Sequence, residues 1–143
     1  MSVTNKKFGT AIGCMDGRVI PAVDAFLKEK YGLDFVDQPT EPGPDAFLAS
    51  GDVAKLESMK AKVLISVNGH GSRLVAVVGH EGCAGNPVER EQHLTDIRKG
   101  MEVLASWDMP DTKIVGLWVA LEPETMKGRV KELDAETLEI EFK

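Results

Sequence analysis

The segment from Arg73 to Gly79 restricts the fold of this chain more than any other feature. Apart from its first residue it is apolar throughout. A strand exposed on one face alternates polar and apolar residues, whereas a parallel strand covered on both faces is apolar at nearly every position. The segment therefore predicts a central strand of a parallel sheet, with helices on both of its faces.

The rest of the chain alternates between strand-like and helix-like segments. Further strands are expected at 7–14, 33–36 and 113–121. Helices are expected at 21–31, from a cap at Asp45 or Ser50 to residue 67, and at 87–107. The alternating segments 129–133 and 137–142 suggest a C-terminal hairpin at the sheet edge. This order predicts an α/β fold, in which helices flank a mostly parallel sheet.

Length and composition restrict the class of protein. A chain of 143 residues is expected to form a single domain, 1–143, and its 43% hydrophobic and 28% charged residues are typical of a globular protein. The net charge of −6 argues against binding of nucleic acid, and no apolar run is long enough to span a membrane. Because the N-terminal residues lack the apolar segment of a secretory signal, the expected location is the cytoplasm.

Two short motifs place metal-binding residue types at the ends of predicted strands. Cys14, Asp16 and Arg18 alternate just after the first strand, and His80 and Cys83 follow the central one. Ligands in such sheets bind beyond the carboxyl ends of the strands, so both motifs are expected at one edge. Two thiolates and an imidazole form a ligand set that zinc prefers, with one position left open.

In this order the two motifs resemble those of the β-class carbonic anhydrases, whose pattern is C-x-D-x-R followed some tens of residues later by H-x-x-C. The resemblance implies that Cys14, His80 and Cys83 bind zinc and that Asp16 and Arg18 form a catalytic pair. It implies reversible hydration of carbon dioxide to bicarbonate by a zinc-bound hydroxide. It also implies a β-carbonic-anhydrase-like fold and a homodimer or higher homo-oligomer.

The aspartate and the arginine have a chemical reason to act together. Two thiolates cancel the charge of Zn²⁺, so water bound to this site is expected to be a weaker acid than at an all-histidine site unless neighbouring groups assist. Arg18 can hold the Asp16 carboxylate in a bidentate pair, which keeps it ionised and directed at the water. In a closed form of the resembling enzymes, the matching aspartate binds zinc itself.

The chain also departs from the pattern of that family. Gly17 stands where serine is common, Ala84 stands where glycine is usual, and the segment 37–43 occupies the region of an Arg-Asn-Ala-Gly motif. The loop 38–44 contains three prolines, which exclude a regular helix or strand. Whether this loop lines the site or covers a subunit interface stays open.

These departures leave alternatives to carbon dioxide hydration. One is a related zinc hydrolase that acts on carbonyl sulfide or carbon disulfide, and another is a non-catalytic zinc protein with Asp16 as a permanent fourth ligand. A thiol redox switch would leave the other motif residues without a role. Gln38 could donate to bicarbonate, and His70 and His93 could relay protons, because histidine titrates near neutral pH.

Overall fold

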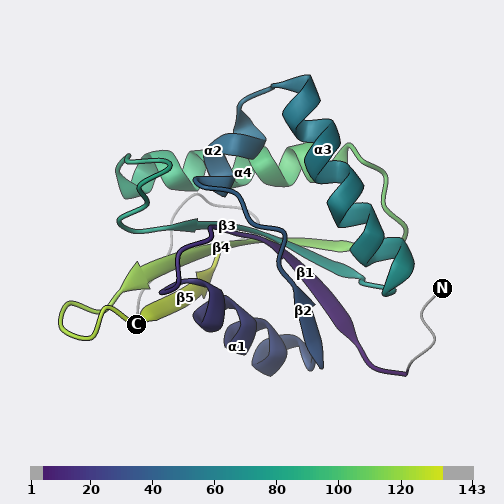
Figure 1. Cartoon of the computed structure of the whole chain (residues 1–143), viewed down its shortest axis with the longest axis horizontal. Helices are drawn as coiled ribbons and strands as arrows, with labels where there is room; N and C mark the ends of the chain where they lie inside the picture. The colour runs from purple at the N-terminus through teal and green to yellow at the C-terminus, as the bar shows by residue number, and fades with distance from the viewer. Residues whose placement is uncertain (1–4, 134–143) are drawn as a thin grey trace.

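A computed structural model describes residues 5–133, which form a five-stranded sheet with helices on both faces (Figure 1). The strands are β1 (Phe8–Ile12), β2 (Phe35–Asp37), β3 (Leu74–His80), β4 (Lys113–Leu121) and β5 (Gly128–Glu132). Their order across the sheet is β2-β1-β3-β4-β5. The first four run parallel, and β5 runs antiparallel to β4. The predicted α/β fold with a mostly parallel sheet is confirmed.

The helices form a layer on each face of the sheet. One face is covered by α1 (Ile20–Tyr31), and the other by α2 (Pro44–Ala49), α3 (Val53–Leu64) and α4 (Arg90–Ala105) (Figure 1). A π-helical turn, η1 (Ile65–Gly69), continues α3. No helix within residues 5–133 has the length and apolar character needed to cross a membrane.

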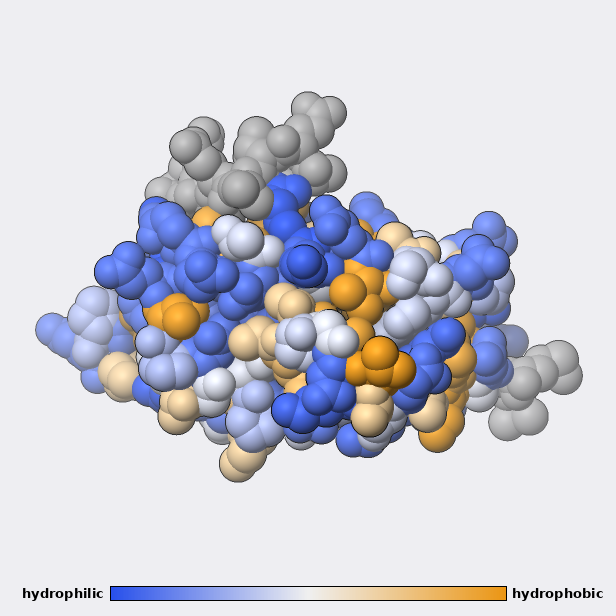
Figure 2. Space-filling model, turned by 90° about the horizontal axis from the view of Figure 1, so that it is seen from above, coloured by the Kyte–Doolittle hydropathy of each residue, from blue (hydrophilic) through white to orange (hydrophobic). Residues whose placement is uncertain are grey.

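All seven residues of β3 are buried, as the apolar run requires. Val75 and Val77 pack in a cluster with residues of α2, α3 and α4, whereas Ala76 and Val78 pack with residues of α1. Each layer of helices therefore covers one set of alternate side chains. The outward face of the α2, α3 and α4 layer is largely hydrophilic, with separate apolar groups (Figure 2).

The helix expected to run to residue 67 is instead two helices. Gly51 adopts φ 75° between them, a conformation that an L side chain rarely adopts. Asp52, rather than Asp45 or Ser50, caps α3, and its Oδ1 accepts a hydrogen bond from the Lys55 backbone N–H at 3.1 Å. Helix α4 likewise begins three residues later than predicted, whereas the bounds of β4 match the prediction.

The edge hairpin is formed by β4 and β5, in which Val119 pairs with Val130. The predicted partner of 129–133, the segment 137–142, lies outside the described residues, so that pairing stays a prediction. At the centre of the sheet, β1 pairs with β3 in a register that joins Ile12 to Val77. The chain passes from β1 through α1 to β2 on one side, and β3 lies on the other side. The carboxyl ends of β1 and β3 therefore meet where the strand order switches, which is the usual place for a site.

Candidate metal centre

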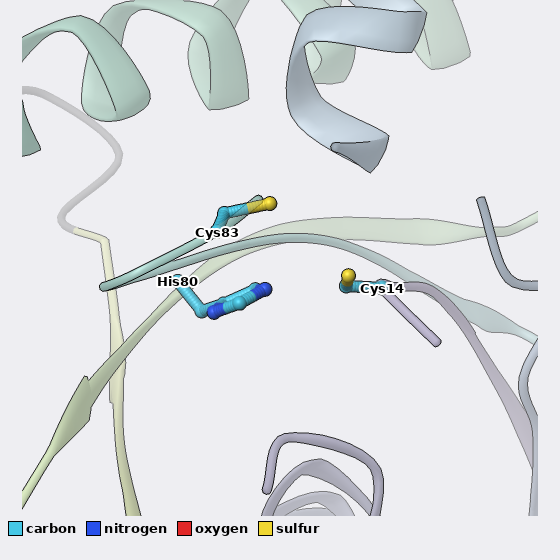
Figure 3. A group of neighbouring side chains, drawn as sticks. All are labelled: Cys14, His80 and Cys83. Atoms are coloured by element: carbon cyan, nitrogen blue, oxygen red, sulfur yellow. The ribbon is translucent and has the colours of Figure 1, made fainter. Parts of the chain in front are cut away.

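The structure brings Cys14, His80 and Cys83 together at this switch point. Their ligand atoms all lie within 4.8 Å of one another, and all three residues are buried. Figure 3 shows the His80 ring, at the end of β3, and the Cys83 side chain reaching toward the space beside Cys14. Both cysteines are free thiols. These three residues come from two motifs that lie far apart in the sequence, and the fold brings them into one cluster.

The hydrogen bond of His80 determines which ring nitrogen faces the cluster. Nδ1 lies 2.8 Å from the carbonyl oxygen of Glu81, and a carbonyl can only accept. Nδ1 therefore carries the hydrogen, and Nε2 presents a lone pair. Nε2 is buried and has no hydrogen-bond partner within the described residues. Burial lowers the pKa of His80, which keeps the ring neutral, as a metal ligand must be.

The Cys83 thiol lies among competing influences. Burial and the neighbouring Cys14 thiol raise its pKa, because a buried thiolate is poorly solvated and two thiolates repel each other. The backbone N–H groups of Asn86, Gly85 and Gly43 hydrogen-bond to the sulfur and act in the opposite direction. The loop therefore solvates a thiolate only in part, and a cation between the two sulfurs would supply the missing charge.

The donor set fits a zinc ion. Tetrahedral zinc, with Zn–S of about 2.3 Å and Zn–N of about 2.0 Å, separates its ligand atoms by roughly 3.5–3.8 Å. The limit of 4.8 Å on the three separations is compatible with that requirement. The lone pair on the unpartnered Nε2 of His80 also needs a hydrogen-bond donor or a cation, since a buried polar atom left alone is unfavourable.

The proline-containing loop lines this cluster. Its Thr40 forms an isolated bridge to Gly13, and the Glu41 N–H donates to the Gly13 carbonyl at 2.9 Å. Further along, Gly43 adopts φ 60° and packs against Gly85 so closely that a Cβ on Gly43 would lie 2.6 Å from the Gly85 oxygen. The loop thus runs beside the residue before Cys14 and against the turn that carries Cys83.

Gly85→Ala should therefore disturb the cluster without changing a ligand. Its Cβ would lie 2.6 Å from the Gly43 nitrogen, a backbone atom that cannot move aside alone. We expect weaker metal binding and a loss of stability of about 1–3 kcal/mol, measured by metal titration and urea unfolding. Gly17→Ala is the matched control, because its Cβ would meet nothing within 4 Å. Equal effects from both variants would contradict this account.

Asp16 and Arg18 form the bidentate pair expected from their spacing. Arg18 Nε lies 3.0 Å from Asp16 Oδ1, and Nη2 lies 2.7 Å from Oδ2. The Arg18 backbone N–H also donates to Oδ1, at 2.8 Å. These hydrogen bonds, the side-chain ones foremost, lower the pKa of Asp16 to about 2. Within the described residues the metal-binding cluster contains no Asp16 atom, so the aspartate is held by the arginine.

The other predicted polar residues are not part of the cluster. Gln38 Nε2 donates to the Ile20 carbonyl at 3.1 Å, so its amide is held at the start of α1. His70 pairs with Asp37 at 2.6 Å and stacks on Phe8, at the opposite end of β1 from Cys14. His93 is 1% exposed, which removes it from solvent contact. The structure therefore brings none of the three into the cluster.

A group of buried polar residues that lies beside the cluster was not predicted from the sequence. Asp45, expected as a helix cap, instead contacts His93 at 2.6 Å, and Asn86 lies within hydrogen-bond distance of Asp45. The available signal was the position of His93 on the apolar face of α4, next to Leu94 and four residues before Ile97, where a titratable side chain needs a buried partner.

The sheet and its crossovers are those of a β-carbonic-anhydrase-type fold, which similar solved structures share. A carbonic anhydrase from Streptococcus mutans has a TM-score of 0.63 and 18% identity, over 94% of this chain and 86% of that one. A β-carbonic anhydrase from Trichomonas vaginalis has a TM-score of 0.55 and 14% identity, over 91% of this chain and 86% of that one. A carbon disulfide hydrolase in its apo form has a TM-score of 0.52 and 16% identity, over 90% of this chain and 79% of that one.

Residues 4–129 match the protein family described as "Putative carbonic anhydrase". The chain belongs to this carbonic anhydrase family. A comparison with curated protein sequences finds no match. The expected resemblance is therefore confirmed over most of the chain, and the matched range contains both motifs.

Proposed function

We propose that the protein is a zinc-dependent carbonic anhydrase, which hydrates carbon dioxide reversibly to bicarbonate. The observation that carries this proposal is the buried cluster of Cys14, His80 and Cys83. The Asp16–Arg18 ion pair follows Cys14 directly in the sequence. Family membership supports an enzyme of the carbonic anhydrase type. The identity of the metal as zinc and the identity of the substrate as carbon dioxide are parts of the proposal.

Each residue has a distinct task in this proposal. Cys14, His80 and Cys83 would hold the zinc ion, which when bound supplies the Lewis acidity that makes water nucleophilic near neutral pH. Asp16 stays ionised and can accept one more hydrogen bond, because a carboxylate offers about four acceptor positions and Arg18 fills three. It would orient the attacking water, and hydration would release one proton to the buffer.

A hollow lies beside Arg18, and the residues that line it do not include Cys14, His80 or Cys83. It has a volume of about 440 Å³, and Arg18, Gly17 and Lys127 are among the residues that line it. It offers a small molecule an approach to Arg18, and the two cationic side chains favour an anion such as bicarbonate.

A second candidate reaction has a specific observation behind it. The segment 37–43 departs from the family pattern and, through Gly43, contacts the turn that carries Cys83. A change in this wall of the site could adapt the same metal chemistry to carbonyl sulfide or carbon disulfide. A non-catalytic zinc protein with Asp16 as fourth ligand is less favoured, because Arg18 holds that carboxylate. Competition between substrates separates the two reactions.

The test starts with metal content per chain on protein purified without added zinc. Stopped-flow carbon dioxide hydration across pH follows on the same sample, with chelator-stripped protein as the control. We expect about one zinc per chain and hydration that is lost on stripping. Zinc without hydration at any pH from mildly acid to mildly alkaline would contradict the proposed reaction. We also propose that the protein forms a homodimer or a higher homo-oligomer, which light scattering on the same sample tests.

A further inference from the structure

Two titratable side chains are fully buried in contact with each other beside the candidate metal centre, and the proposed reaction does not use them. Asp45 is 0% exposed and His93 is 1% exposed. His93 Nδ1 lies 2.6 Å from Asp45 Oδ2, and the His93 ring packs on Trp118 with centroids 5.3 Å apart. Burying such groups is costly even when they are paired, so their place in the fold calls for a reason.

Asn86 connects this pair to the turn that carries Cys83. Its Nδ2 lies 3.3 Å from Asp45 Oδ1 and 3.2 Å from Asp96 Oδ2, so the two amide hydrogens bridge α2 and α4. The Asn86 backbone N–H bonds to the Cys83 carbonyl at 3.3 Å and also to the Cys83 sulfur. The side chain of Asn86 is therefore held by the buried pair while its backbone holds the thiol.

The same carboxylate also lies against the backbone that precedes His80. A Cβ on Gly79 would lie 2.8 Å from Asp45 Oδ2, so only glycine leaves room for the carboxylate there. Trp118, which packs on His93, pairs with Gly79 in the β3–β4 register. Asp45 follows Gly43 by two residues, and the Gly43 N–H reaches the Cys83 sulfur. The pair thus contacts the Cys83 turn through Asn86 and the end of β3 through Gly79, and Asp45 itself lies at the start of α2.

We propose that Asp45, His93 and Asn86 form a positioning network, which holds the Cys83 turn and the start of α2 so that the Cys83 thiolate is directed at the metal. None of the three contacts the metal in this arrangement. The inference rests on the metal site of the proposed function. It assigns His93 a role in positioning the Cys83 ligand, in place of the proton relay suggested by its residue type.

The test measures metal binding directly rather than turnover. Cobalt titration gives an affinity, and the visible and sulfur-to-cobalt absorption bands report whether the thiolates bind in tetrahedral geometry. His93→Leu removes the donor but keeps an apolar side chain, and we expect a 10- to 100-fold loss of cobalt affinity with altered bands. His93→Asn keeps a donor near the Nδ1 position and should restore affinity to within about threefold.

Two further variants separate positioning from general loss of stability. Val63→Ala creates a cavity in the same core, away from the Cys83 turn, and should leave cobalt affinity and bands unchanged. If His93→Leu does not fold, Asn86→Ala removes only the amide bridge and should lower affinity in the same way. Wild-type affinity and bands in His93→Leu or in Asn86→Ala would overturn the network. Wild-type protein that binds no cobalt or zinc would instead overturn the metal site itself.

Discussion

Replacing Cys83 by serine should remove the bound metal and reduce carbon dioxide hydration to the rate of buffer alone. The thiolate is one of only three side chains in the described cluster, and a serine hydroxyl is a poor ligand for zinc. Zinc binding in small structural sites is worth roughly 10–16 kcal/mol, so one ligand of three or four contributes about 3 kcal/mol or more. That loss corresponds to more than about a hundredfold in affinity.

The measurement is metal content after dialysis, followed by stopped-flow hydration of the same sample. Ala84→Ser is the matched control, because it places the same hydroxyl on the exposed neighbour of Cys83 and leaves the cluster intact. We expect the control to keep its metal and its activity. A Cys83→Ser protein that retains one zinc per chain would show that the metal is bound elsewhere.

Asp16→Asn should slow hydration strongly while the metal remains bound. The amide keeps the shape of the side chain but presents one acceptor oxygen in place of two, so both the pairing with Arg18 and the orientation of water are weakened. A positioned group that handles a proton typically contributes about 10²- to 10⁴-fold, and we expect a loss in that range. Metal content should stay at the wild-type level, because Asp16 lies outside the cluster.

The pH dependence of this effect follows from the pairing with Arg18. The hydrogen bonds from Arg18 lower the pKa of Asp16 to about 2, so the carboxylate is ionised throughout the range in which hydration is measured. The ratio of wild-type to variant rates should therefore be constant from about pH 5 to 9. Asp24→Asn is the matched control, because Asp24 also pairs with a cation, Lys28 at 2.9 Å, on the surface of α1. A ratio that collapses near pH 7 would contradict this assignment.

Much of the candidate site could be predicted because its chemistry is local. Cys14, Asp16 and Arg18 alternate within five residues, and that spacing already places the carboxylate within reach of the guanidinium. The apolar run of β3 required cover on both faces, and the packing of Val75 and Val77 against one layer and Ala76 against the other confirms this. Residue type and period were sufficient for these features.

Other features depended on contacts that no local pattern records. The break at Gly51 divides α2 from α3, because a glycine at φ 75° and the Asp52 cap outweigh an apolar pattern that would fit one longer helix. The loop at 38–44 was recognised only as irregular, and its last residue, Pro44, begins α2. Its packing of Gly43 against Gly85 exists because the loop crosses the end of the sheet beside the Cys83 turn.

The α/β class, the position of the central strand and the identity of the clustered residues could all be predicted from the sequence. Their types, their spacing and the apolar period are properties of short segments. The contact of Asp45 with His93, 48 residues away, and the link through Asn86 to the Cys83 turn could not be predicted in this way. They exist because α2 and α4 pack on the same face of the sheet, so the burial that forces these polar groups to pair arises only when the chain is folded.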